Sequence, residues 1–75
     1  MKTKKQNFTV FLYLITDDYE DDFRNIDITN NFIFWIKKGI RPVVGDYTQD
    51  EENYYIVTKV FLNEDCMHIT LKEGE

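Results

Sequence analysis

The sequence predicts an α+β fold, mainly β, in which about five antiparallel strands and one short helix form a single small domain. Several short segments alternate apolar and polar residues, which is typical of strands. A chain of 75 residues is long enough for only one hydrophobic core. Hydrophobic residues make up 43% of it, too many for a disordered acidic segment. We therefore expect residues 1–75 to form one domain, with residues 1–6 and 73–75 as flexible ends.

The first expected strand, Phe8–Thr16, is apolar on both faces. Such a strand lies in the middle of a sheet or is covered on both sides. Residues 17–22 follow and hold five carboxylates, whose mutual repulsion favours a solvated turn. A weaker strand is expected over Phe23–Ile28.

One short helix is expected near residues 30–38. Thr29 or Asn30 can cap its first turn, and Gly39 can adopt the left-handed conformation that ends many helices. The apolar run 32–36 also suits a buried strand on β-propensity alone. The start and stop signals favour the helix over this alternative.

The C-terminal half reads as three strands in succession. A bend at Gly45 leads into a short strand within Val43–Thr48, and Tyr54–Leu62 has the clearest alternation in the chain. The last strand runs from Cys66 to about Lys72, after a three-residue loop. Short loops join antiparallel strands. A two-layer α+β domain and a small, strongly bent barrel both fit this order.

This half also resembles a known type of fold. Pro42, Gly45 and Asp46, followed by the alternation in residues 54–60 and 67–71, resemble the "P-x-x-G-D, Y-x-V-x-x-V, I-x-L" pattern of SH3-like small barrels. The pattern is also similar to that of uncharacterised small proteins carried by bacterial phages and mobile elements. The resemblance implies a partly open SH3-like barrel, and it transfers no catalytic or ligand-binding residues.

The charge of the chain restricts its partners. A net charge of −5 opposes the phosphate backbone, so we do not expect direct nucleic-acid binding. Lys37, Lys38 and Arg41 form a weak basic patch. The two lysines already have a structural reason to be there, because cations stabilise the C-terminal end of a helix.

We expect no membrane partner and a cytoplasmic location. No apolar stretch approaches the roughly 18 residues of a membrane span. Lys2, Lys4 and Lys5 precede the apolar run 8–15, as in a secretory signal, but no small-residue cleavage site follows. Cys66 is the only cysteine, so no internal disulfide can form, which fits a reducing compartment.

The sequence predicts no catalytic, cofactor-binding or metal site. Serine is absent, which excludes a serine nucleophile. Cys66 and His68 share one strand face, but zinc sites need three or four protein ligands, and a nucleophile pair needs an orienting partner. The run 17–22 lacks the glycine and the final glutamate of a calcium-binding EF-hand loop.

Aromatic residues make up 16% of the chain, which is more than a core of this size is expected to hide. Alternation places several of them on the second face of the first and fourth strands. We expect that face to form an interaction surface, made of Phe11, Tyr13, Tyr55, Val57 and Phe61. The alternative is that twist and helix packing bury these side chains within one subunit.

The function expected from these features is that of a non-enzymatic protein–protein interaction module, which binds a protein partner or forms a homo-oligomer through this aromatic sheet face. The alternative is an acidic inhibitor or nucleic-acid mimic, which the charge of −5, concentrated at residues 17–22 and 50–53, suggests. An origin in a phage or mobile element is what the resemblance above implies. A third hypothesis, an enzyme built on Cys66 and His68, predicts a reactive thiol.

Overall fold

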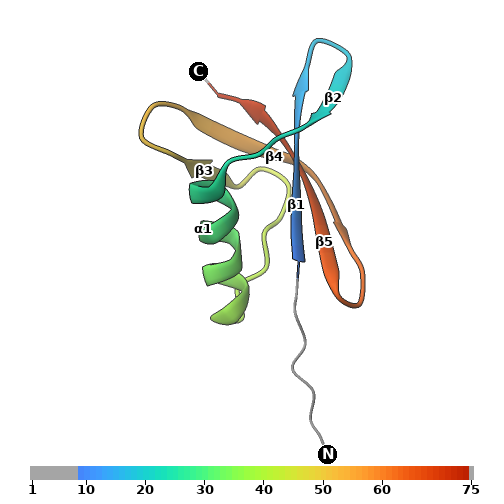
Figure 1. Cartoon of the computed structure of the whole chain (residues 1–75), viewed down its shortest axis with the longest axis vertical. Coiled ribbons are helices and arrows are strands. Elements are labelled where there is room, and N and C mark those ends of the chain that lie inside the picture. The colour runs from blue at the N-terminus through green and yellow to red at the C-terminus, as the bar shows by residue number, and fades with distance from the viewer. Residues whose placement is uncertain (1–8, 75) are drawn as a thin grey trace, which may run out of the picture.

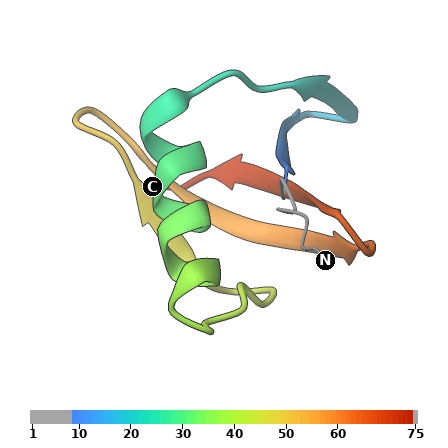
Figure 2. The ribbon, with the colours of Figure 1, turned by 60° about the horizontal axis from the view of Figure 1, so that its bottom comes forward.

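Five strands form one open sheet in the order β2-β1-β5-β4-β3, and a helix packs against one face of it (Figures 1 and 2). The computed structural model describes residues 9–74, so the expected flexible end at residues 1–6 lies outside the described residues. The elements are β1 (Thr9–Thr16), β2 (Tyr19–Asp22), α1 (Ile26–Lys37), β3 (Tyr47–Gln49), β4 (Tyr54–Leu62) and β5 (Cys66–Glu73). This arrangement confirms the mainly β, α+β class with five strands and one helix, and the sheet does not close into a barrel.

β5 is the middle strand of the sheet. It forms an antiparallel hairpin with β4, as the short loop between them predicts. It also pairs with β1, from Thr9 opposite Cys66 to Leu14 opposite Leu71, and this pairing is parallel. The expectation of antiparallel strands throughout is therefore wrong for this one pair. No short loop joins β1 to β5, so their connectivity does not require an antiparallel arrangement.

The core lies between α1 and the sheet face that we call the inner face. Ile28 and Phe32 of α1 are fully buried there. Alternate residues of β1 and β5 point to the same side, as the sequence pattern predicts. The sheet residues buried in this cluster are Val10, Leu12, Tyr55, Val57, Met67, Ile69 and Leu71.

A β-bulge divides β4 into two parts. The register with β5 slips between Val57 and Lys59, so that Thr58 is an extra residue. Before the bulge, Tyr55 and Val57 face α1 and are buried. After it, Lys59 and Phe61 lie on the opposite face, because an extra residue reverses the alternation of side chains.

β2 occupies the position where the sequence suggested a turn. It pairs antiparallel with the second half of β1, and the turn before it is confined to Asp17 and Asp18. All four residues of β2 are exposed at the edge of the sheet, where water solvates the carboxylates and charge discourages edge-to-edge association. The strand expected over Phe23–Ile28 does not form.

α1 confirms the predicted helix but begins earlier than expected. Asn25, and not Thr29 or Asn30, is the N-cap: its side-chain oxygen accepts a hydrogen bond from the Ile28 N–H at 3.1 Å. The alternating residues before Ile28 had suggested a strand at this point. At the other end, Gly39 has φ +84°, the left-handed conformation expected of it.

The same cap connects the helix to the loop before β4. The Asn25 amide donates a hydrogen bond to an Asp50 carboxylate oxygen at 2.8 Å. The other oxygen accepts from the backbone N–H groups of Asn53 and Glu52. These three donors stabilise the ionised form, so they lower the pKa of Asp50, with the Asn53 N–H contributing most.

The chain after β5 also contributes to the sheet. Glu73 pairs with Tyr55, and the Gly74 N–H donates to the Tyr54 carbonyl at 2.8 Å. Residues 73 and 74 therefore continue the pairing with β4, where the sequence suggested a flexible end. Residue 75 lies outside the described residues.

Replacing the cap tests this account of α1. Asn25→Ala removes the acceptor for the Ile28 N–H and the donor to Asp50, so we expect a loss of about 1–2 kcal/mol in the free energy of unfolding. Urea denaturation followed by circular dichroism measures it. The matched control is Asn30→Ala, in an exposed position within the helix, which should be neutral or slightly stabilising. Equal losses in the two variants would contradict the assignment of the cap.

Candidate interaction surface

The five residues of the expected interaction surface do not lie together. Tyr55 and Val57 belong to the core beneath α1, so assigning them to the surface was wrong. The bulge at Thr58 is the reason, because strict alternation would have kept them on the same face as Phe61. Burial of the Tyr55 ring raises the pKa of its hydroxyl, and the charge of Asp50 adds to the rise.

Phe11, Tyr13 and Phe61 do meet, on the face opposite α1, which we call the outer face. His68 of β5 lies between them. The Phe11 ring stacks on the imidazole with centroids 5.0 Å apart, the Tyr13 ring stacks at 5.8 Å, and the Phe61 ring lies at 6.0 Å. We call these four residues the outer-face cluster.

Strand register explains why the outer-face cluster forms. His68 stands opposite Phe11 in the parallel pair and opposite Phe61 in the antiparallel pair. Side chains at directly opposite positions on neighbouring strands are close enough to pack. The cluster therefore depends on three adjacent strands and on the bulge that brings Phe61 to the outer face.

The outer-face cluster remains accessible. Phe11 is 44% exposed and Phe61 is 58% exposed, although both rings contact His68. The only helix within residues 9–74 packs on the inner face of the sheet (Figure 2). It therefore does not cover the rings on the outer face. Two large apolar side chains thus share one patch of surface, the kind of feature that marks a contact site.

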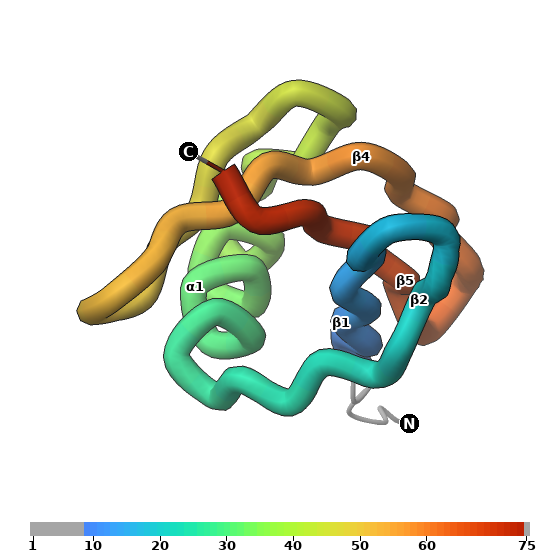
Figure 3. Tube along the Cα trace, turned by 90° about the horizontal axis from the view of Figure 1, so that it is seen from above, coloured from blue at the N-terminus to red at the C-terminus, as the bar shows by residue number. Residues whose placement is uncertain are grey.

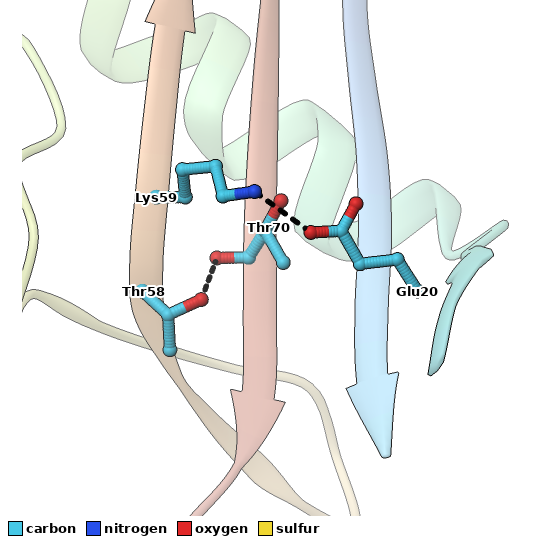
Figure 4. A network of polar contacts seen from close by, with 4 residues as sticks. All are labelled: Glu20, Thr58, Lys59 and Thr70. Atoms are coloured by element: carbon cyan, nitrogen blue, oxygen red, sulfur yellow. Dashed lines mark hydrogen bonds and ion pairs between the residues drawn. The ribbon is translucent and has the colours of Figure 1, made fainter. Parts of the chain in front are cut away.

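Charged and polar groups border the outer-face cluster on one side. Lys59 Nζ lies 3.0 Å from Glu20 Oε2, and the two side chains reach toward each other near Thr70 (Figure 4). Thr58 donates its hydroxyl to the Thr70 carbonyl at 3.2 Å. The ion pair is exposed, so it adds little stability. Its effect is to give the aromatic patch a charged rim, as in many protein interfaces.

His68 is also part of a polar chain. Tyr13 Oη lies 2.7 Å from His68 Nδ1, and Cys66 Sγ lies 3.7 Å from His68 Nε2. Cys66 and His68 therefore share a face, as predicted. A phenolic hydroxyl can donate or accept, so Tyr13 is compatible with either tautomer of the imidazole and with its charged form.

Tyr13 supplies the orienting partner that the sequence did not reveal for the cysteine–histidine pair. Sequence reasoning missed it because only the parallel pairing of β1 and β5 brings it to His68. Chemically, the three groups can move a proton from the thiol to the imidazole, which would leave a nucleophilic thiolate. The Cys66 side chain is half-buried at the start of β5.

A second aromatic pair lies at the other edge of the sheet. Tyr47 of β3 and Tyr54 of β4 make an edge-to-face contact with centroids 5.8 Å apart. Sequence reasoning had not singled out either residue. Tyr54 and Ile56 alternate on one face of β4, which the sequence pattern shows, but only the register of β3 brings Tyr47 to that face.

Other types of site receive no support from residues 9–74. Within them, no three or more His, Cys, Asp or Glu side chains are grouped so that they could hold a metal ion. The helix they contain is too short and too polar to cross a membrane. Of the expected basic patch, Lys37 lies in the last turn of α1, and Lys38 Nζ lies 5.1 Å from the centre of the Phe34 ring.

Comparison of the chain with models of protein families, with curated proteins and with solved structures finds no match.

The Cys66–His68–Tyr13 chain makes a testable prediction about the thiol. If His68 accepts the thiol proton, iodoacetamide should label Cys66 faster in the folded protein than in urea. His68→Gln should remove the difference, because glutamine cannot take up the proton. Mass spectrometry of timed samples measures the rates. Labelling of the folded protein no faster than that of the denatured chain would show that the pair serves only for packing.

Proposed function

We propose that this chain is a non-enzymatic protein-interaction module that associates with a second copy of itself through the outer-face cluster. The observation that carries this proposal is the exposure of Phe11 and Phe61 on either side of the His68 ring on the outer face. Removing such rings from water is the main source of affinity in protein interfaces, and aromatic residues are frequent among the side chains that dominate binding.

The shape of the patch supports pairing of like surfaces. A two-fold interface places the same patch on both partners, so each aromatic group must find an apolar group opposite. The outer-face cluster offers this, because Phe11 and Phe61 flank the half-buried His68 ring. The charged rim formed by Lys59 and Glu20 contains both signs, so two copies can approach in an orientation that pairs unlike charges.

A cytoplasmic location belongs to the same proposal. Cys66 lies beside the cluster, 3.7 Å from His68 Nε2. In an oxidising compartment a half-buried free thiol at an interface is open to disulfide formation between copies. A reducing compartment keeps the thiol free and leaves association to depend on the aromatic contacts.

Substitution of Phe61 tests the proposed surface. Phe61→Gln should weaken self-association by about tenfold or more, as expected for a central aromatic contact. Phe34→Gln is the matched control, because Phe34 is 57% exposed but lies on α1, away from the outer face. Sedimentation equilibrium at micromolar concentration measures both. A wild-type chain that stays monomeric, or equal effects of the two substitutions, would refute the proposal.

One observation favours the acidic-inhibitor alternative. The β1–β2 hairpin carries five carboxylates over residues 17–22, and all six residues of this segment are exposed. Only Glu20 among them has a cationic partner, Lys59, within residues 9–74. A concentration of unpaired negative charge on a projecting hairpin is suited to binding a basic protein surface.

This alternative makes a different prediction about salt. Attraction between exposed charges is screened over about 8 Å at physiological ionic strength, so inhibitor-type binding to a basic nuclease or repressor should weaken as salt rises. Isothermal titration at low and high salt measures this. Self-association through apolar rings should be unchanged or strengthened by salt, so binding that weakens at high salt would distinguish the inhibitor from the self-associating module.

A further inference from the structure

A groove of about 630 Å³ lies between β1 and the start of α1. Residues 10–13 of β1 form one wall, and residues 22–26 with Thr29 form the other. Figure 3 shows the connection from β2 to α1 running along one side of the space between β1 and the helix. The size is within the usual range for ligand-binding clefts.

The backbone of β1 points alternately to the two sides of this strand. The Thr9 N–H donates to the Asp65 carbonyl at 3.1 Å, on the side of β5. The Leu12 carbonyl accepts from the Phe23 N–H at 3.0 Å, on the opposite side. The N–H and C=O of one residue in a strand point the same way, and those of the next residue point the other way. Val10 and Leu12 therefore direct their backbone groups away from β5.

On that side, β2 does not extend along the whole of β1. It pairs only with Tyr13–Thr16, and the chain leaves the edge after the bond from Phe23 to Leu12. Both backbone groups of Val10 and the N–H of Leu12 consequently face the groove without a backbone partner in residues 9–74. Along this edge of β1, the Val10 N–H is a hydrogen-bond donor, the Val10 carbonyl is an acceptor, and the Leu12 N–H is a second donor.

Charge around this edge is strongly negative. The β1–β2 hairpin and the first turn of α1 carry six exposed carboxylates. Among residues 9–74, the cations beside them are Arg24, which lines the groove, and Lys59, which pairs with Glu20. The carboxylates belong to Asp17, Asp18, Glu20, Asp21, Asp22 and Asp27. Asp22 also lines the groove, and it stands opposite Tyr13, which places it on the outer side of the strand edge.

The other side of the edge is apolar. Phe23 packs against the core, and Ile26 stands at the groove with 74% of its surface exposed. A strand added to β1 would direct alternate side chains to these two environments. One set would contact Ile26 and Phe23, and the other set would lie beside Asp22.

We propose that the groove binds an extended peptide segment of a partner protein with alternating apolar and basic side chains, added as a strand to the open edge of β1. Strand addition satisfies the backbone groups of Val10 and Leu12, and alternation of the side chains gives specificity. The proposal goes beyond the self-association proposed above, because it gives the chain a second, different partner. It uses the groove and not the exposed Phe61 ring, so the two can fail separately.

A peptide of repeated Val-Lys units is the probe, with a Val-Glu peptide of equal length as control. We expect the Val-Lys peptide to shift the amide resonances of Val10 and Leu12 in a nuclear magnetic resonance titration, and to bind more weakly as salt rises. The Val-Glu peptide should leave them unmoved. No binding at millimolar peptide, or shifts confined to His68 and Phe61, would overturn the proposal.

N-methylated probes test for backbone pairing independently of register. Alternate residues of an added strand direct their N–H groups to β1. One version of the Val-Lys peptide carries a methyl group on the backbone nitrogen of every valine, and the other carries it on that of every lysine. We therefore expect one version to lose binding and the other to keep it. Equal affinity of the two versions would mean that the peptide is not held as a strand.

Two lysine substitutions locate the site on the protein. Ile26→Lys puts a cation in the groove and should weaken binding of the Val-Lys peptide by about tenfold. Val44→Lys adds the same charge at a 65% exposed position that does not line the groove, and should change affinity by less than about twofold. Equal effects would refute the site. Phe61→Gln should keep peptide binding, so loss of self-association in that variant bears only on the proposed function.

Discussion

Pairing of β5 on both of its edges is the interaction on which the rest of the structure depends. β1 and β4 flank it, and Met67, Ile69 and Leu71 carry the buried face against α1. A small domain has one core, and here the central strand supplies much of it. The opposite face of β5 carries His68, so the same strand that organises the core also holds the centre of the outer-face cluster.

The local features of the fold could be predicted from the sequence because they depend on local chemistry. Alternation in β5, the tight loop before it and Gly39 at the end of α1 each have a short-range physical cause. The start of α1 was misplaced because Asn25 lies in a segment that also alternates as a strand does. An asparagine followed within the first turn by Asp27 was the signal for the cap.

The candidate site could be predicted only in part, because it is made by long-range register. The exposed aromatics Phe11 and Phe61 followed from the excess of ring side chains over core volume. The sheet face on which Tyr55 and Val57 lie could not be predicted, because no glycine or proline marks the bulge at Thr58. The Tyr13–His68 contact and the groove beside β1 both require that β1 lie parallel to β5, which no property of either segment alone specifies.

The parallel pairing of β1 with β5 affects when the protein can fold during its synthesis. β1 is the first described strand to leave the ribosome and β5 is the last, so β1 reaches its pairing with β5 only after β5 is made. Contacts between distant parts of a chain form slowly, and exposed apolar strands are prone to aggregate in the meantime. Helix and hairpin can form early as isolated, unstable pieces. The domain as a whole is therefore acquired after synthesis of its final strand, in one late cooperative step.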